Sequence, residues 1–142
     1  MNSTRSRFAV AVLLTLTFFV LSAGWAQAQS IRLKANIPFA FRAGEKLLPA
    51  GEYDVQTLEN RVVVRILGPD ADNSVMFTTV GVSHQIGEDK DAKLIFNKYG
   101  DDYILSEMWW PEQQDGRKAF PSKTEGELAK NVTPVRIAVA LR

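Results

Sequence analysis

Hydrophobic and polar residues alternate along most of the chain that follows residue 30. In the first run, every second position from Ile31 to Phe41 is apolar. Similar runs, or runs rich in β-branched residues, follow at 52–58, 61–67, 75–80 and 135–141. A period of two predicts strands that turn one face to a core, and the run at 61–67, apolar on both faces, predicts a central strand. Pro38 lacks an N–H and indicates a sheet edge or a bend within the first run.

The strongest hairpin signal lies between residues 93 and 110. Two largely apolar runs, Lys93–Tyr99 and Tyr103–Trp110, flank a turn made of a glycine and two aspartates. This pattern predicts a β-hairpin. A two-residue loop and a three-residue loop both fit the turn, and they bring different faces of the two strands together, so the register stays open.

A polar stretch after the hairpin predicts the one helix of the chain. Ser122 or Thr124 can cap a short helix that ends near Asn131, with Glu125 or Glu127 placed three residues after the hydroxyl, as in a capping box. Strands at hairpin spacing without a long helical period indicate an all-β fold. We therefore predict a small antiparallel β-sandwich or partly open β-barrel of about seven strands, with one short helix in its C-terminal half.

The first 28 residues have the pattern of a secretory signal. Arg5 and Arg7 precede a long apolar run, and the small residues Ala26 and Ala28 close the segment. This order predicts a Sec-type signal peptide that is cleaved after Ala28, which leaves residues 29–142 as a single β domain. The alternative is an uncleaved membrane anchor. The apolar run is short for a spanning helix, and we expect no integral membrane segment after signal removal.

Charge and cysteine content narrow the compartment and the partners. The chain has 17 basic and 16 acidic residues, and removal of the signal with its two arginines leaves 15 against 16, a net charge of −1. A balance so close to neutral argues against nucleic acid as a partner. The absence of cysteine excludes disulfides and thiolate zinc sites, and it is ordinary in a bacterial periplasm. We predict a secreted or periplasmic protein of a Gram-negative bacterium.

Three segments carry a resemblance to a known group of proteins. They read IPFAFRAGEKLLPAGEYDV, KLIFNKYGDDYILSEMWW and GRKAFPSKTEGELAK, and their most specific parts are the strings PAG-x-Y-x-V and YGD-x-Y-x-L-S-E. In this order they resemble a family of small secreted bacterial proteins of unknown function, over most of the chain from Ala35 to Lys130. The resemblance implies a shared fold and brings no activity, because the strings consist of turn residues and inward-facing aromatics.

Residue sets for catalysis or metal binding are sparse. The single histidine, His84, directly follows Ser83, and neighbouring strand residues point to opposite faces, so the two cannot form a nucleophile and base pair. Asp70, Asp72 and Ser74 resemble the first half of a calcium loop, but the required glycine and glutamate are missing further on. We predict a solvent-exposed His84, no metal site, no cofactor and no enzymatic activity.

Glu107 is the one acid in the middle of an apolar strand. Simple alternation places it on the same face as Tyr103, Leu105 and Trp109. An inward-facing Glu107 would have a raised pKa, as the general acid of a carbohydrate-active hydrolase requires. The competing expectation is an ion pair across the sheet, with a basic residue from a short set: Arg61, Arg65 or Lys98.

Aromatic residues supply the best hint of binding. Trp109 and Trp110 are consecutive in a strand, so one should enter the core and the other, which we take to be Trp110, should face solvent. We predict a non-enzymatic binding or envelope-interaction module that contacts an unknown protein or small molecule through Trp109, Trp110, Glu107 and Tyr103. The alternative is a carrier of a small lipophilic ligand, in which the aromatic side chains line a barrel cavity rather than fill it.

Overall fold

The computed structural model describes residues 32–58, 61–83, 91–111 and 115–142. The predicted signal peptide and its cleavage site, as well as His84, lie outside the described residues. No helix in the described part of the chain is both long and apolar enough to cross a bilayer.

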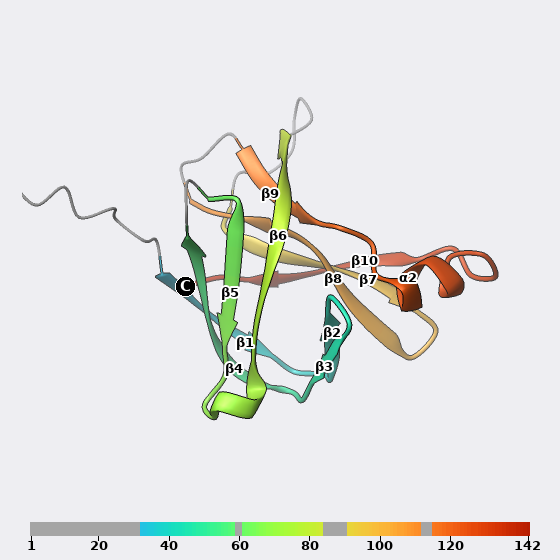
Figure 1. The fold of residues 1–142 in the computed structure, drawn as a ribbon, viewed down its shortest axis with the longest axis horizontal. Helices are drawn as coiled ribbons and strands as arrows, with labels where there is room; N and C mark the ends of the chain where they lie inside the picture. Colours follow the sequence, from blue (N-terminus) through green and yellow to red (C-terminus); the bar gives the residue numbers. More distant parts are fainter. Residues whose placement is uncertain (1–31, 59–60, 84–90, 112–114) are drawn as a thin grey trace, which may run out of the picture.

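Within these residues, ten strands form one mixed sheet, accompanied by one short α-helix and one 3-10 turn (Figure 1). The N-terminal strands are β1 (Arg32–Ile37), β2 (Phe41–Ala43), β3 (Lys46–Leu48), β4 (Gly51–Leu58), β5 (Val63–Leu67) and β6 (Ser74–Ser83), with the turn η1 (Ala71–Asn73) between the last two. The C-terminal part contains β7 (Lys93–Tyr99), β8 (Asp102–Trp109), β9 (Asp115–Ala119), α2 (Lys123–Leu128) and β10 (Val135–Ala140).

The long strand β6 joins two antiparallel groups of strands. Its first half pairs with β5, in the group β1-β4-β5-β6, and its second half pairs with β9, which continues to β8, β7 and β10. The short hairpin β2–β3 attaches to β8 by a single parallel pairing, between Arg42 and Ile104. Strands that neighbour one another in the sheet curl around a common interior (Figure 1).

The curled sheet almost closes on itself where β10 meets β1. Ala35 and Leu141 form an isolated antiparallel bridge, and the backbones of Lys34 and Arg142 exchange two hydrogen bonds of 2.8 and 2.9 Å. Beyond this bridge the two strands are not paired, so the sheet stays open and forms a partly open barrel, one of the two architectures that the sequence predicts. The predicted seven strands become ten because β2, β3 and β9 are too short or too polar to show an alternating pattern.

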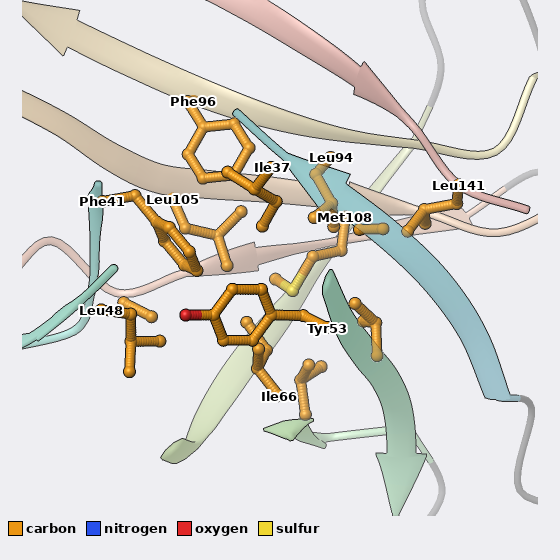
Figure 2. Close-up of a cluster of buried hydrophobic side chains, with 14 of the residues drawn as sticks. Ile37, Phe41, Leu48, Tyr53, Ile66, Leu94, Phe96, Leu105, Met108 and Leu141 are labelled. Carbon is orange, nitrogen blue, oxygen red and sulfur yellow. The ribbon is translucent and has the colours of Figure 1, made fainter. Parts of the chain in front are cut away.

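The interior of the barrel is filled by aliphatic and aromatic side chains. Phe41 lies 5.2 Å from Tyr53 and 5.4 Å from Phe96 between ring centroids, in edge-on geometry, and Leu105 and Met108 point into the same space (Figure 2). The Tyr53 hydroxyl donates to the Pro49 carbonyl at 2.7 Å, and burial raises the pKa of this phenol. Each fully buried side chain of this size contributes roughly 1.5–3 kcal/mol.

A second group of buried side chains lies outside the central cluster, on β7, β8 and β9. It consists of Ile95, Tyr99, Ile104, Trp109 and Ala119. In an antiparallel sheet with one solvated face, these positions would alternate with the core and face water. Here the hairpin β7–β8 is buried on both faces, which the sequence alternation alone does not predict.

The helix starts at the predicted cap. Ser122 is the N-cap of α2, and its side chain accepts a hydrogen bond of 3.0 Å from the backbone N–H of Glu125. The side chain of Glu125 does not complete a capping box. It bonds to residues of β7 instead, and so ties the helix to the sheet.

Candidate functional site

A bulge in β8 rearranges the residues that the sequence assigns to a site. Ile95 of β7 pairs with Glu107, whereas the next residue, Phe96, pairs with Leu105, so one extra residue lies in β8 between them. A bulge of this kind shifts the alternation of side chains beyond it by one position. Leu105 accordingly belongs to the central cluster, while Glu107 bonds to the side chain of Trp109 on the other face. The predicted common face of Tyr103, Leu105, Glu107 and Trp109 is wrong.

The two tryptophans are both buried, which corrects the expectation that Trp110 faces solvent. Trp110 is 1% exposed and belongs to the central cluster, and its indole N–H has no acceptor among the described residues. Trp109 is 4% exposed and lies directly over Gly116 of β9, where a Cβ would come within 2.6 Å of the indole ring. Because both faces of β8 are covered, consecutive residues are buried on opposite sides, and no exposed indole exists at this end of the hairpin.

Glu107 forms an ion pair, with a partner that differs from the predicted residues. Its Oε2 accepts a hydrogen bond of 2.7 Å from the Arg136 guanidinium of β10 and one of 3.2 Å from the Trp109 indole. Arg61, Arg65 and Lys98 do not take this role. These contacts give Glu107 a structural role between β8 and β10. In the described part of the chain, no group of three or more metal-ligating side chains is present.

Tyr103 lies apart from the other predicted site residues. Its ring stacks on Phe39 with 3.9 Å between centroids, and the Lys98 ammonium lies 5.2 Å from the centre of the ring. These contacts place Tyr103 at the margin of the central cluster, where it is half-buried. The four predicted residues Trp109, Trp110, Glu107 and Tyr103 therefore do not converge on one binding surface.

Along the outer edge of β10, backbone hydrogen-bonding groups lack partners among the described residues. The N–H of Leu141 bonds to Ala92, on the side of β7, whereas Arg142 bonds to Lys34, on the opposite side. Backbone groups of a strand alternate in direction, so those of Arg136, Ala138 and Ala140 point away from β7. Among the described residues, none of these three has a backbone partner on that side.

A hollow of about 390 Å³ opens where β1 and β10 separate. Its lining consists of Lys34, Asn36, Glu52, Val139, Ala140 and Arg142. Lys34 and Glu52 form an exposed ion pair of 3.8 Å across its β1 side. The hollow is polar and open to solvent, and it adjoins the unpaired backbone groups of β10.

A second hollow, of about 240 Å³, lies between α2 and the outer face of the hairpin. The carboxylate of Glu125 is buried at its base, where Oε1 accepts hydrogen bonds from the Asn97 amide at 2.9 Å and from the Tyr99 hydroxyl at 3.3 Å. Burial, together with the nearby charge of Glu125, raises the pKa of Tyr99. The sequence marks Glu125 only as a helix-capping residue, because nothing local indicates that its side chain meets β7.

Comparisons with known proteins return no match. No protein-family model matches the chain, and neither the curated proteins nor the solved structures contain a significant relative. The resemblance to small secreted bacterial proteins stays a prediction.

Proposed function

We propose that this protein is an exported, non-enzymatic binding module, which takes up an extended segment of a partner protein as an additional strand along β10. The partner segment alternates apolar and acidic residues. Support for export comes from the pattern of the first 28 residues. The observation that carries the binding role is the unpaired edge formed by Arg136, Ala138 and Ala140.

An exposed edge of this composition is an unusual feature in a β protein. Natural edge strands are commonly protected by proline, by a bulge or by a lysine that points inward. β10 reads VRIAVA. It has no proline, its pairing with β7 is regular along its whole length, and its one charged side chain, Arg136, pairs with Glu107. Backbone hydrogen bonds to an incoming strand would satisfy the free groups, which is how β-augmentation gains its affinity.

The side chains along this edge favour a particular kind of segment. Val135 is 60% exposed, and Ile137 and Val139 are half-buried on the same face, so an added strand gains from apolar residues at alternate positions. Basic side chains stand on or beside the other face: Lys34, Arg136 and Arg142. Arg136 and Lys34 already pair with Glu107 and Glu52, so the preference for acidic residues in the segment depends mainly on Arg142.

The lipophilic carrier finds less support from the geometry. The aromatic side chains that could line a cavity pack against one another instead, as in the stacked pair Phe39 and Tyr103 and the edge-on pair Phe41 and Phe96. The hydrolase alternative needs Glu107 to be free to meet a substrate, but its carboxylate contacts Arg136 and the Trp109 indole instead. Neither alternative has an observation of its own in its favour.

The edge is tested with a strand-length synthetic peptide that alternates valine and glutamate. The binding constant is measured by isothermal titration calorimetry for the unchanged protein and for Ala138→Pro and Ala138→Val. Proline removes the outward N–H and places its ring in the path of the peptide, so we expect at least about tenfold weaker binding. Valine retains the N–H, and Ala138→Val should bind like the unchanged protein.

A peptide that alternates valine and lysine is the control for charge, and it should bind more weakly at low salt than the glutamate peptide. Equal binding of Ala138→Pro and Ala138→Val would show that the edge is not used. Light scattering decides between a foreign partner and a second copy of this chain. A concentration-dependent dimer that Ala138→Pro abolishes would replace our proposal by self-pairing of β10.

A further inference from the structure

The hollow between α2 and the hairpin contains a charge arrangement that packing alone does not require. Glu125 is 9% exposed, and both of its hydrogen bonds from the sheet end on one oxygen, Oε1. No described residue donates to Oε2. Oε2 is not one of the fully buried atoms that lack a partner, so it stays accessible from the hollow, and a group that enters the hollow can reach it.

The lining of the same hollow also includes a positive charge. Lys118 of β9 lines it, and its ammonium group has no carboxylate within ion-pair distance among the described residues. Ser106, the residue at the bulge of β8, is buried against the hollow and offers a hydroxyl that can donate or accept. Ala119 and Pro121 form an apolar part of the wall.

We propose that this hollow is a binding site for a small zwitterion of amino-acid size. The ligand's ammonium group donates to Oε2 of Glu125, and its carboxylate meets Lys118 and the Ser106 hydroxyl. A volume of about 240 Å³ admits a molecule of this size. Charge-assisted hydrogen bonds at both ends would give the site its selectivity.

This assignment gives a role to the Glu125 oxygen that does not anchor the helix to β7. A glutamine could accept the same two hydrogen bonds from Asn97 and Tyr99 through its one oxygen. Glu125 lies in the first turn of α2, where a negative charge also favours the helix, and its second oxygen is left to receive a cationic group that enters the hollow. The site lies on the outer face of β7 and β8, so this proposal does not depend on partner binding at the β10 edge.

The test uses L-alanine as the zwitterionic probe, with methylamine, acetate and glycerol as partial mimics. Titrations are followed by chemical shifts of the backbone amides, above all those of Gly126 and Ala129, which line the hollow. We expect saturable binding of L-alanine and at least about tenfold weaker binding of methylamine and of acetate, because each lacks one charged contact. Glycerol should give no saturable shift.

Two variants and one control assign the contacts. Glu125→Gln retains the bonds to Asn97 and Tyr99 but should weaken L-alanine binding by about tenfold or more, with little change in melting temperature. Lys118→Gln changes an exposed side chain, folds like the unchanged protein and should weaken binding several-fold. Lys130→Gln, an exposed lysine that does not line the hollow, should have no effect.

The proposal is overturned if L-alanine gives no saturable shifts at millimolar concentration, since Glu125 then only anchors the helix. The ligand is not a zwitterion if methylamine binds as tightly as L-alanine, or if Lys118→Gln leaves the affinity unchanged. Because neither variant alters β10, peptide binding at the edge should persist in both.

Discussion

β8 and β10 both neighbour β7, yet they differ in almost every respect. β8 is buried on both faces, with Leu105 and Met108 in the central cluster and Ile104 and Trp109 on the other side. β10 has no fully buried residue, and one of its two edges is unpaired. The aromatic richness of β8 therefore reflects its structural role. The outer edge of β10 has no paired strand among the described residues, and this edge is where we propose that a partner binds.

The structural role of the buried hairpin is tested most directly at Trp110. Trp110→Ala should destabilise the protein by about 3–5 kcal/mol, because it removes a large buried ring and leaves a cavity. The free energy of unfolding in urea measures this. Phe120→Ala, which truncates an aromatic ring that is 56% exposed, is the matched control and should change stability by less than about 1 kcal/mol.

Trp110→Phe refines the same test. The indole N–H of Trp110 has no acceptor among the described residues, and an unsatisfied buried donor costs about 1–3 kcal/mol. Phenylalanine removes this donor and retains most of the apolar ring, so its destabilisation should be much smaller than that of alanine. Equal stability of Trp110→Ala and the unchanged protein would mean that Trp110 lies on the surface.

The next largest effect distinguishes the two edges of β10. Val139→Pro removes an N–H that points to β7 and breaks the ladder, with an expected cost of about 2–3 kcal/mol. Ala138→Pro removes an N–H on the open edge and should cost less than about 1 kcal/mol. Both are measured by urea unfolding. The reverse order of the two costs would show that β10 faces β7 with its other edge.

The parts of the fold that follow from local pattern were predictable. Alternation reveals β1, β4 and the hairpin β7–β8, and the hydroxyl of Ser122 marks the start of α2. The two-residue loop of the hairpin, Gly100 and Asp101, was one of two possibilities, and Gly100 adopts the φ of +62° that such a turn requires.

The candidate site was hidden because it depends on contacts between distant segments. The bulge in β8 places Glu107 and Leu105 on opposite faces, and no residue type in that strand indicates it. Arg136 becomes the partner of Glu107 only because β10 returns beside β7, far along the chain. The free edge of β10 depends on distant contacts in the same way. β10 meets β1 only at the bridge between Leu141 and Ala35, and the sequence does not indicate where this contact ends.

The smallest effect concerns the covered outer face of the hairpin and appears at alkaline pH. The pKa of Tyr99 is raised above 10.0 by burial and by the charge of Glu125. Below pH 10 the phenol is protonated in both states. Above it the unfolded chain loses the proton first, so the folded state binds more protons and stability falls as pH rises towards the raised pKa. Tyr99→Phe has no such proton, and its free energy of unfolding should decline less steeply above pH 10.

Tyr53→Phe serves as the comparison from the central cluster, since burial alone raises the pKa of Tyr53. In the double variant Tyr99→Phe with Glu125→Gln, the slope should match that of Tyr99→Phe alone. A slope unchanged by Tyr99→Phe would place this phenol in solvent, and the outer face of the hairpin would then be no more enclosed than β10.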